Sequence, residues 1–156
     1  MDTEAHWSHD MVMPVLLAEA RLAYAGEIRR AFADAGFDDM PRAGARVIGR
    51  IAFGGTNVND VAAVYGVSKQ AASQLVDALV ARGYVERTPD EDDRRRMLVG
   101  LTERGAAAAE ELKDAIERVD AALAESFGES EILQAKRVIA ALVEFHHREH
   151  EQPGDA

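Results

Sequence analysis

One stretch of the chain, residues 57–105, decides the fold. It reads NVNDVAAVYGVSKQAASQLVDALVARGYVERTPDEDDRRRMLVGLTERG. The first half holds two short segments with helical apolar spacing, 57–65 and 68–82, joined by a tight turn at Gly66. The second half holds two strand-like runs, 84–88 and 97–101, separated by Pro89 and a charged cluster. This order predicts a helix-turn-helix followed by a β-hairpin with a long, exposed tip.

The predicted helix 68–82 separates two kinds of side chain. Its apolar face carries Ala71, Ala72, Leu75, Val76, Leu79 and Val80. Its polar face carries Lys69, Gln70, Ser73, Gln74 and Asp77. Ser68 is the expected N-cap and Gly83 the expected stop. Glutamine can bond adenine with two hydrogen bonds, lysine can reach guanine, and a helix N-terminus attracts phosphate. The pattern predicts a recognition helix for the major groove; the alternative is an ordinary amphipathic surface helix.

The tip of the predicted hairpin is rich in charge, reading PDEDDRRR over residues 89–96. A wing beside a helix-turn-helix needs a cation at its tip to enter a minor groove or to meet a phosphate. Asp93 lies two residues before Arg95, on the same face of a strand, and can hold that arginine in position. The alternative is a solvated charge run that keeps the hairpin edge soluble.

The net charge of −10 by itself argues against a nucleic-acid partner. However, residues 68–104 hold seven basic and seven acidic side chains, so the acidic excess lies in the rest of the chain. Longer helical patterns flank this neutral segment, over 11–35, 42–53, 103–127 and 131–150. Pro14 fits a first helical turn, and Thr102 is the expected N-cap of the third of these helices. Their apolar stripes need a partner surface, within one chain or across a dimer.

Several classes of protein are disfavoured by what the sequence lacks. The absence of cysteine excludes disulfides and a thiol switch. No signal peptide, membrane span, nucleophile motif or glycine-rich phosphate loop is evident, so we expect a cytoplasmic protein that is not an enzyme and has no cofactor. His146 and His150 share a helical face at a spacing that can hold zinc. The alternative for them, and for His147, is a solvated helix end whose histidines favour the negative dipole.

The motifs of residues 67–77, 82–87, 89–95 and 98–105 together resemble the MarR family of transcription regulators. The acid-Arg-Arg tip, the strand after it and the run Leu101-Thr102-Glu103-Arg104-Gly105 follow the family's wing pattern. The resemblance extends over about residues 10–150. One departure is Gln74, where many members carry a basic residue; it predicts weaker, more selective binding.

The resemblance implies a mainly α fold with a two-stranded β-wing, forming one domain over residues 1–156. Residues 10–35 and 103–150 would be dimerisation helices, and residues 42–102 the winged helix-turn-helix lobe. The family forms homodimers that bind near-palindromic duplex DNA. Carried over to this chain, the DNA contacts are Ser68, Lys69, Gln70, Ser73, Gln74, Asp93, Arg94 and Arg95. From the apolar stripes we expect an interface that includes Val12, Leu16, Leu123, Val138, Leu142 and Phe145.

The resemblance further implies an effector, a small aromatic acid or phenol bound between the dimerisation helices and the DNA-binding lobe. The chain offers Arg21, Tyr24, Arg46, Arg50 and Phe53 for it, with Ile48 as a further apolar wall. The alternative for Arg46 and Arg50 is ion pairing with Glu19, Glu27 or Asp60. The expected function is therefore a repressor of transcription that a ligand releases from DNA. The competing hypothesis is a small-molecule-binding or protein-interaction module of the same fold that does not read DNA.

Overall fold

The first long helix, α1 (Met13–Asp34), follows a short 3-10 helix, η1 (Trp7–Asp10). Pro14 lies in the first turn, where backbone N–H groups have no acceptor within the helix, so the missing N–H of proline costs little. Gly36, with φ +79°, lies just beyond the end of the helix. The computed structural model describes residues 7–52, 54, 62, 66–90 and 97–150, the side chains of His9 and 146–150 excepted. The predicted helix 57–65, apart from Ala62, and residues 91–96 of the hairpin tip therefore lie outside the described residues.

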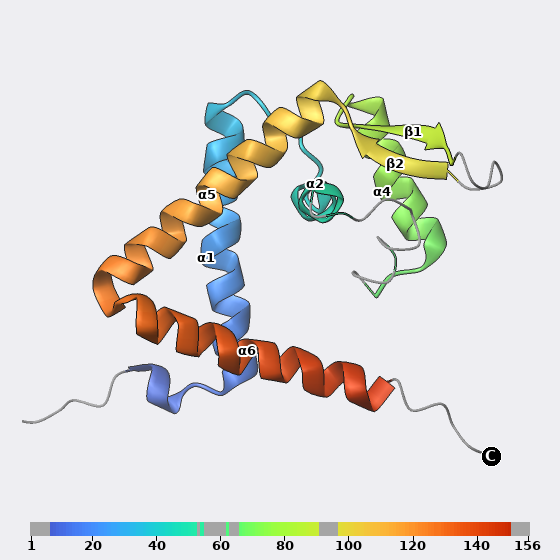
Figure 1. Cartoon of the computed structure of the whole chain (residues 1–156). Helices are drawn as coiled ribbons and strands as arrows, with labels where there is room; N and C mark the ends of the chain where they lie inside the picture. Colours follow the sequence, from blue (N-terminus) through green and yellow to red (C-terminus); the bar gives the residue numbers. More distant parts are fainter. Residues whose placement is uncertain (1–6, 53, 55–61, 63–65, 91–96, 151–156) are drawn as a thin grey trace, which may run out of the picture. The chain divides into compact units, whose positions relative to one another are not determined.

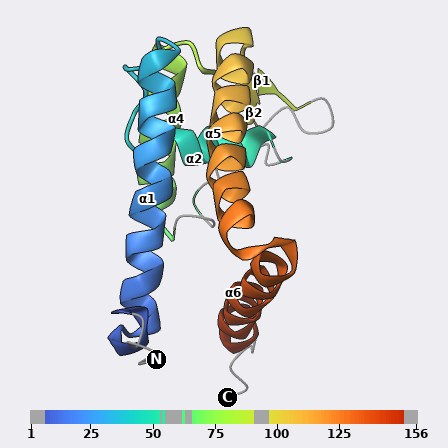
Figure 2. The same cartoon turned by 90° about the vertical axis from the view of Figure 1, so that its left-hand side faces the viewer.

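The chain divides into two compact units, Met1–Ile116 and Glu117–Ala156. In the first unit, α2 (Gly44–Ala52) runs across the direction of α1, as the two perpendicular views in Figures 1 and 2 show. Next come α4 (Lys69–Ala81) and a hairpin of β1 (Val85–Pro89) and β2 (Met97–Leu101). α5 (Glu103–Phe127) begins in the first unit and ends in the second, where α6 (Glu129–His150) follows.

The boundaries of α4 agree with the prediction. The Ser68 hydroxyl accepts a hydrogen bond from the Ala71 amide at 3.2 Å, and Gly83 has φ +73°. The buried stripe is narrower than predicted and consists of Ala72, Val76 and Leu79. Ala71 and Val80 also belong to the apolar face, but they are exposed. Residues at i, i+4 and i+7 form one line along a helix, and only that line meets the core.

The hairpin begins one residue later than predicted. β1 and β2 are antiparallel, with Val85 opposite Leu101 and Pro89 opposite Met97. Pro89 closes β1, contrary to the prediction that it lies between the strands. A proline is compatible with a strand end because the missing N–H interrupts no continuing ladder there.

A single core joins these elements of the first unit. Tyr84, Val47, Ile48, Val76, Leu79, Val85 and Val99 form its largest completely buried side chains. Ala62, Ala72 and Ala108 complete the cluster. α4 and the hairpin lie side by side and pack on this core (Figure 1), which fixes the exposed face of α4 relative to β1.

The second unit contains two helices that present apolar surface to solvent. Lys136 on α6 pairs with Asp120 on α5 at 2.8 Å. On α6, Leu133, Val138, Ile139, Leu142, Val143 and Phe145 are each at least 45% exposed. None of the described helices is long and apolar enough to cross a membrane.

Candidate nucleic-acid interface

The N-terminal half of α4 presents polar side chains outward. Ser68 caps the helix, and Lys69, Gln70 and Gln74 are exposed. The buried stripe on the opposite side anchors the helix, so these three side chains are free of the core. The arrangement offers amide and ammonium donors on a fixed helix, as groove reading requires.

Ser73 differs from the other predicted contacts because it is only partly exposed. Its hydroxyl accepts a hydrogen bond from Nη2 of Arg87 on β1 at 3.3 Å. The same nitrogen pairs with Oδ1 of Asp77 on α4 at 2.9 Å. Ser73 is therefore held by the wing strand, a contact that the sequence does not predict.

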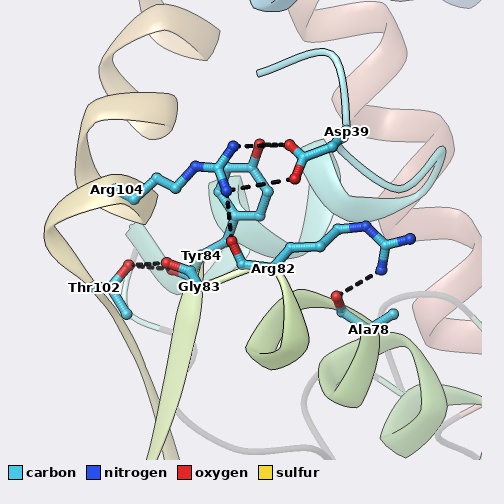
Figure 3. A network of polar contacts seen from close by, with 7 residues as sticks. All are labelled: Asp39, Ala78, Arg82, Gly83, Tyr84, Thr102 and Arg104. Atoms are coloured by element: carbon cyan, nitrogen blue, oxygen red, sulfur yellow. Dashed lines mark hydrogen bonds and ion pairs between the residues drawn. The ribbon is translucent and has the colours of Figure 1, made fainter. Parts of the chain in front are cut away.

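The C-terminal end of α4 is attached to the first turn of α5, as Figure 3 shows. Three successive backbone carbonyls, those of residues 82–84, accept hydrogen bonds from α5 and the residue before it. Arg104 donates to the carbonyl of Arg82 at 2.7 Å, and the Thr102 hydroxyl lies 2.6 Å from the carbonyl of Gly83 and 3.1 Å from that of Tyr84. Thr102 also accepts from the Gly105 amide at 3.0 Å, which confirms its predicted role as N-cap. These contacts fix the corner between α4 and β1.

Asp39, in the loop between α1 and α2, extends this corner. The Tyr84 hydroxyl donates to Asp39 Oδ1 at 2.5 Å, and Arg104 Nη2 donates to the same oxygen at 2.9 Å. The Arg104 guanidinium also lies over the Tyr84 ring, 4.4 Å from its centroid. The hydrogen bond from Tyr84, followed by the charge of Arg104, lowers the pKa of Asp39 despite partial desolvation. Burial, with the same hydrogen bond and the Asp39 charge, raises the pKa of Tyr84 to about 12.

The residues predicted for the wing tip, Asp93, Arg94 and Arg95, lie outside the described residues, as does Phe53. The two strands nevertheless define where the tip begins and ends, since Pro89 pairs with Met97.

The predicted effector residues are distributed over α1 and α2. Arg46 and Arg50 are exposed on α2, Arg21 is exposed on α1, and Tyr24 is half-buried. Ile48, the proposed apolar wall, is completely buried in the core. Glu27, one of the acids considered as their partner, pairs with Arg30 at 3.3 Å. Within the described part of the chain, no cluster of three or more metal-ligating side chains occurs; the side chains of His146, His147 and His150 are outside that part.

The sequence pattern did not reveal the contacts that Asp39, Tyr84 and Arg87 make around the candidate site. Asp39 and Arg104 are 65 residues apart in the chain. No local periodicity reports such a contact. The nearest signal is the run of residues 101–105, whose threonine and glycine both take part in the corner.

Taken together, the hairpin, the capped α4 and the attached α5 define a winged-helix protein. Comparisons with solved structures agree at the level of fold. A crystal structure of MarR has a TM-score of 0.76 at 21% identity, covering 96% of this chain and 100% of that one. The repressor CouR, bound to a 23-mer DNA duplex, has a TM-score of 0.69 at 20% identity, covering 91% and 99%.

Sequence comparison finds a family likeness in the winged segment. Residues 38–96 match the model of the MarR family. The multiple antibiotic resistance protein MarR of Escherichia coli is 44% identical over 48 residues. That match covers 31% of this chain and only a third of the relative's length, 33%.

Proposed function

We propose that the chain is a sequence-specific regulator of transcription that binds duplex DNA through α4 and the wing. The exposed polar N-terminal half of α4 carries the proposal, because Lys69, Gln70 and Gln74 project from a helix whose other face is fixed in the core. The likeness in fold to CouR, which was solved on a DNA duplex, supports duplex DNA as the partner.

Each proposed contact has a chemical reason. Gln70 and Gln74 present amides that can bond adenine edges, and Lys69 can reach guanine. Ser68 and the free amides of the first α4 turn suit a phosphate oxygen. Arg94 and Arg95 at the wing tip would meet the minor groove or its phosphates, with Asp93 bracing Arg95.

We propose that the active form is a homodimer. The support is the apolar surface of α6, where Val138, Leu142 and Phe145 are each at least half exposed. Val12, in front of α1, is 65% exposed, and Leu16 and Leu123 are partly exposed. Apolar surface of this extent is typical of an interface, and two copies would carry two recognition helices to a near-palindromic site.

The resemblance to the MarR family motivates a proposal about the direction and control of regulation. We propose a repressor that a small aromatic acid or phenol releases from DNA. Arg46 and Arg50 lie four residues apart on the exposed face of α2 and could meet one carboxylate. A ligand that binds the DNA-free state more tightly than the DNA-bound state would weaken operator binding.

The test is fluorescence anisotropy with duplexes from the region upstream of the protein's own gene, at two salt concentrations. We expect one duplex to bind at least tenfold more tightly than a scrambled duplex of the same length, with affinity falling as salt rises. A panel of aromatic acids then shows whether affinity falls. Equal, weak binding to both duplexes would favour the competing module that binds a small molecule or a protein, which the net charge of −10 motivates.

A further inference from the structure

Arg87 on β1 occupies an unusual position between the wing and the reading helix. One nitrogen, Nη2, contacts both the Ser73 hydroxyl and the Asp77 carboxylate. These two partners are four residues apart, so they lie one above the other on the same face of α4. Because β1 lies beside α4 (Figure 1), a single guanidinium spans the two DNA-binding elements.

The contacts of Arg87 contribute little to the stability of the fold. The Nε of Arg87 is buried and has no hydrogen-bond partner among the residues that the structure describes. An unsatisfied buried donor lowers stability, and exposed ion pairs return little. The Arg87 side chain is 31% exposed and that of Asp77 58%, so the pair by itself is a weak source of stability. These contacts therefore add little net stability, which is consistent with a role of Arg87 in binding.

The charge of Asp77 indicates what Arg87 does for binding, because Asp77 is the one carboxylate among the polar side chains of α4. A negative charge on a face presented to phosphates opposes binding to every DNA sequence alike. Arg87, 2.9 Å away, pairs with this carboxylate and at the same time donates a hydrogen bond to the Ser73 hydroxyl.

We propose that Arg87 is a positioning residue of the DNA-binding surface, which neutralises Asp77 and withdraws Ser73 from base reading. The inference rests on the proposed function. It restricts base reading on α4 to Lys69, Gln70 and Gln74, and it makes Asp77 a determinant of how strongly the protein binds DNA of arbitrary sequence.

The experiment is a charge cycle on the full-length protein. Affinities for an operator duplex and a scrambled duplex are measured at several salt concentrations for wild type, Arg87→Met, Asp77→Asn and the double variant. Arg30→Met is the matched control, since Arg30 also pairs with an acid, Glu27, but on α1. Circular dichroism melts report whether each variant folds. Asp77 is more than half exposed, so Asp77→Asn gives a folded variant even where Arg87→Met does not.

We expect Arg87→Met to weaken binding to both duplexes about tenfold, because Asp77 is left unpaired near phosphates. Asp77→Asn should strengthen binding to the scrambled duplex and steepen the salt slope by up to about one, because it frees the Arg87 charge for a phosphate. The operator preference should fall accordingly. The double variant should recover most of the affinity that Arg87→Met loses.

Two results would overturn the inference. If the double variant binds as weakly as Arg87→Met, Arg87 itself contacts DNA and Asp77 is irrelevant. If Asp77→Asn leaves the scrambled-duplex affinity and the salt slope at wild-type values, Asp77 does not oppose DNA. A wild-type protein that binds neither duplex is a different outcome, because it rejects the proposed function on which the inference rests.

Discussion

Tyr84→Phe removes one oxygen atom from the corner between α4 and β1 and leaves the ring in place. Tyr84 is completely buried, and its ring would keep its edge contact with Phe37, at a centroid distance of 6.0 Å. The variant loses only the hydrogen bond to Asp39. It therefore isolates one contact of the corner shown in Figure 3.

The loss of stability expected for Tyr84→Phe follows from the charge of Asp39, which accepts the hydrogen bond. A hydrogen bond to a charged group contributes about 1.5–3 kcal/mol. Asp39 keeps its pair with Arg104 and is 41% exposed, so water partly replaces the lost donor. We expect the lower value, about 1.5 kcal/mol, which for a chain of this size lowers the Tm by about 3–6 °C.

The pH dependence gives a sharper test. The pKa of Asp39 is lowered in the folded protein, chiefly by the Tyr84 hydroxyl. A group with a lowered folded pKa stabilises the fold above its unfolded pKa and loses that contribution as pH falls through the folded pKa. The difference between wild type and variant should therefore be largest near neutral pH and shrink below about pH 4.

At alkaline pH, ionisation of Tyr84 should also reduce the difference in stability between wild type and Tyr84→Phe. Burial raises the pKa of Tyr84 to about 12 in the folded protein. A group with a raised folded pKa stabilises the fold fully below its unfolded pKa, about 10, and loses that contribution as pH rises through the folded value. The phenylalanine variant has no proton to lose at this position, so the two proteins should converge between about pH 10 and 12.

Urea denaturation followed by circular dichroism, at one protein concentration and several pH values, measures these differences. Asp39→Asn should reproduce the loss on the acid side, whereas Asp38→Asn, at the exposed neighbouring carboxylate, should not. Equal unfolding midpoints near pH 7, or a difference that stays constant down to about pH 3, would refute the reasoning.

Four further predictions concern other features. Gly105→Ala places a Cβ 1.8 Å from the Tyr84 carbonyl oxygen, so it should destabilise by more than about 3 kcal/mol and greatly reduce soluble yield. Ser68→Ala should lower stability by about 1 kcal/mol in a thermal melt, and Ser68→Asp should keep most of the wild-type value. Gln70→Ala should cost about 1–3 kcal/mol on the operator and relax one base pair in a randomised-site selection; an unchanged selected site would contradict the assigned reading face. Sedimentation should give a species about twice 17.0 kDa at micromolar concentration, and Leu142→Glu should shift it to the monomer.

Local chemistry explains why the elements could be predicted from the sequence. Ser68 and Gly83 bound α4 because a hydroxyl cap and a positive φ are properties of single residues. Apolar spacing likewise indicated the long helices to within a few residues, though it could not say which apolar residues are covered. Val80 shows this, since it lies on the apolar face and is still 39% exposed.

The contacts that hold the candidate site together could not be predicted in this way. Arg87 meets Ser73 across 14 residues, and Arg104 meets Asp39 across 65. Such pairs depend on how the hairpin and the α1–α2 loop pack against their neighbours. The pattern of charges along the sequence does not predict this packing. From the sequence alone, Arg87 and Arg104 therefore cannot be distinguished from ordinary surface charges.

The attachments of α4 are separate from the side chains it offers to solvent. The buried stripe and the α4–β1 corner hold the helix by Ala72, Val76, Leu79 and the carbonyls after its end, whereas Lys69, Gln70 and Gln74 take no part in that support. Exchanging these three residues should therefore change which sequence is preferred without weakening the scaffold. New binding preferences could arise on this chain, by selection or by engineering, through few substitutions and with little loss of stability.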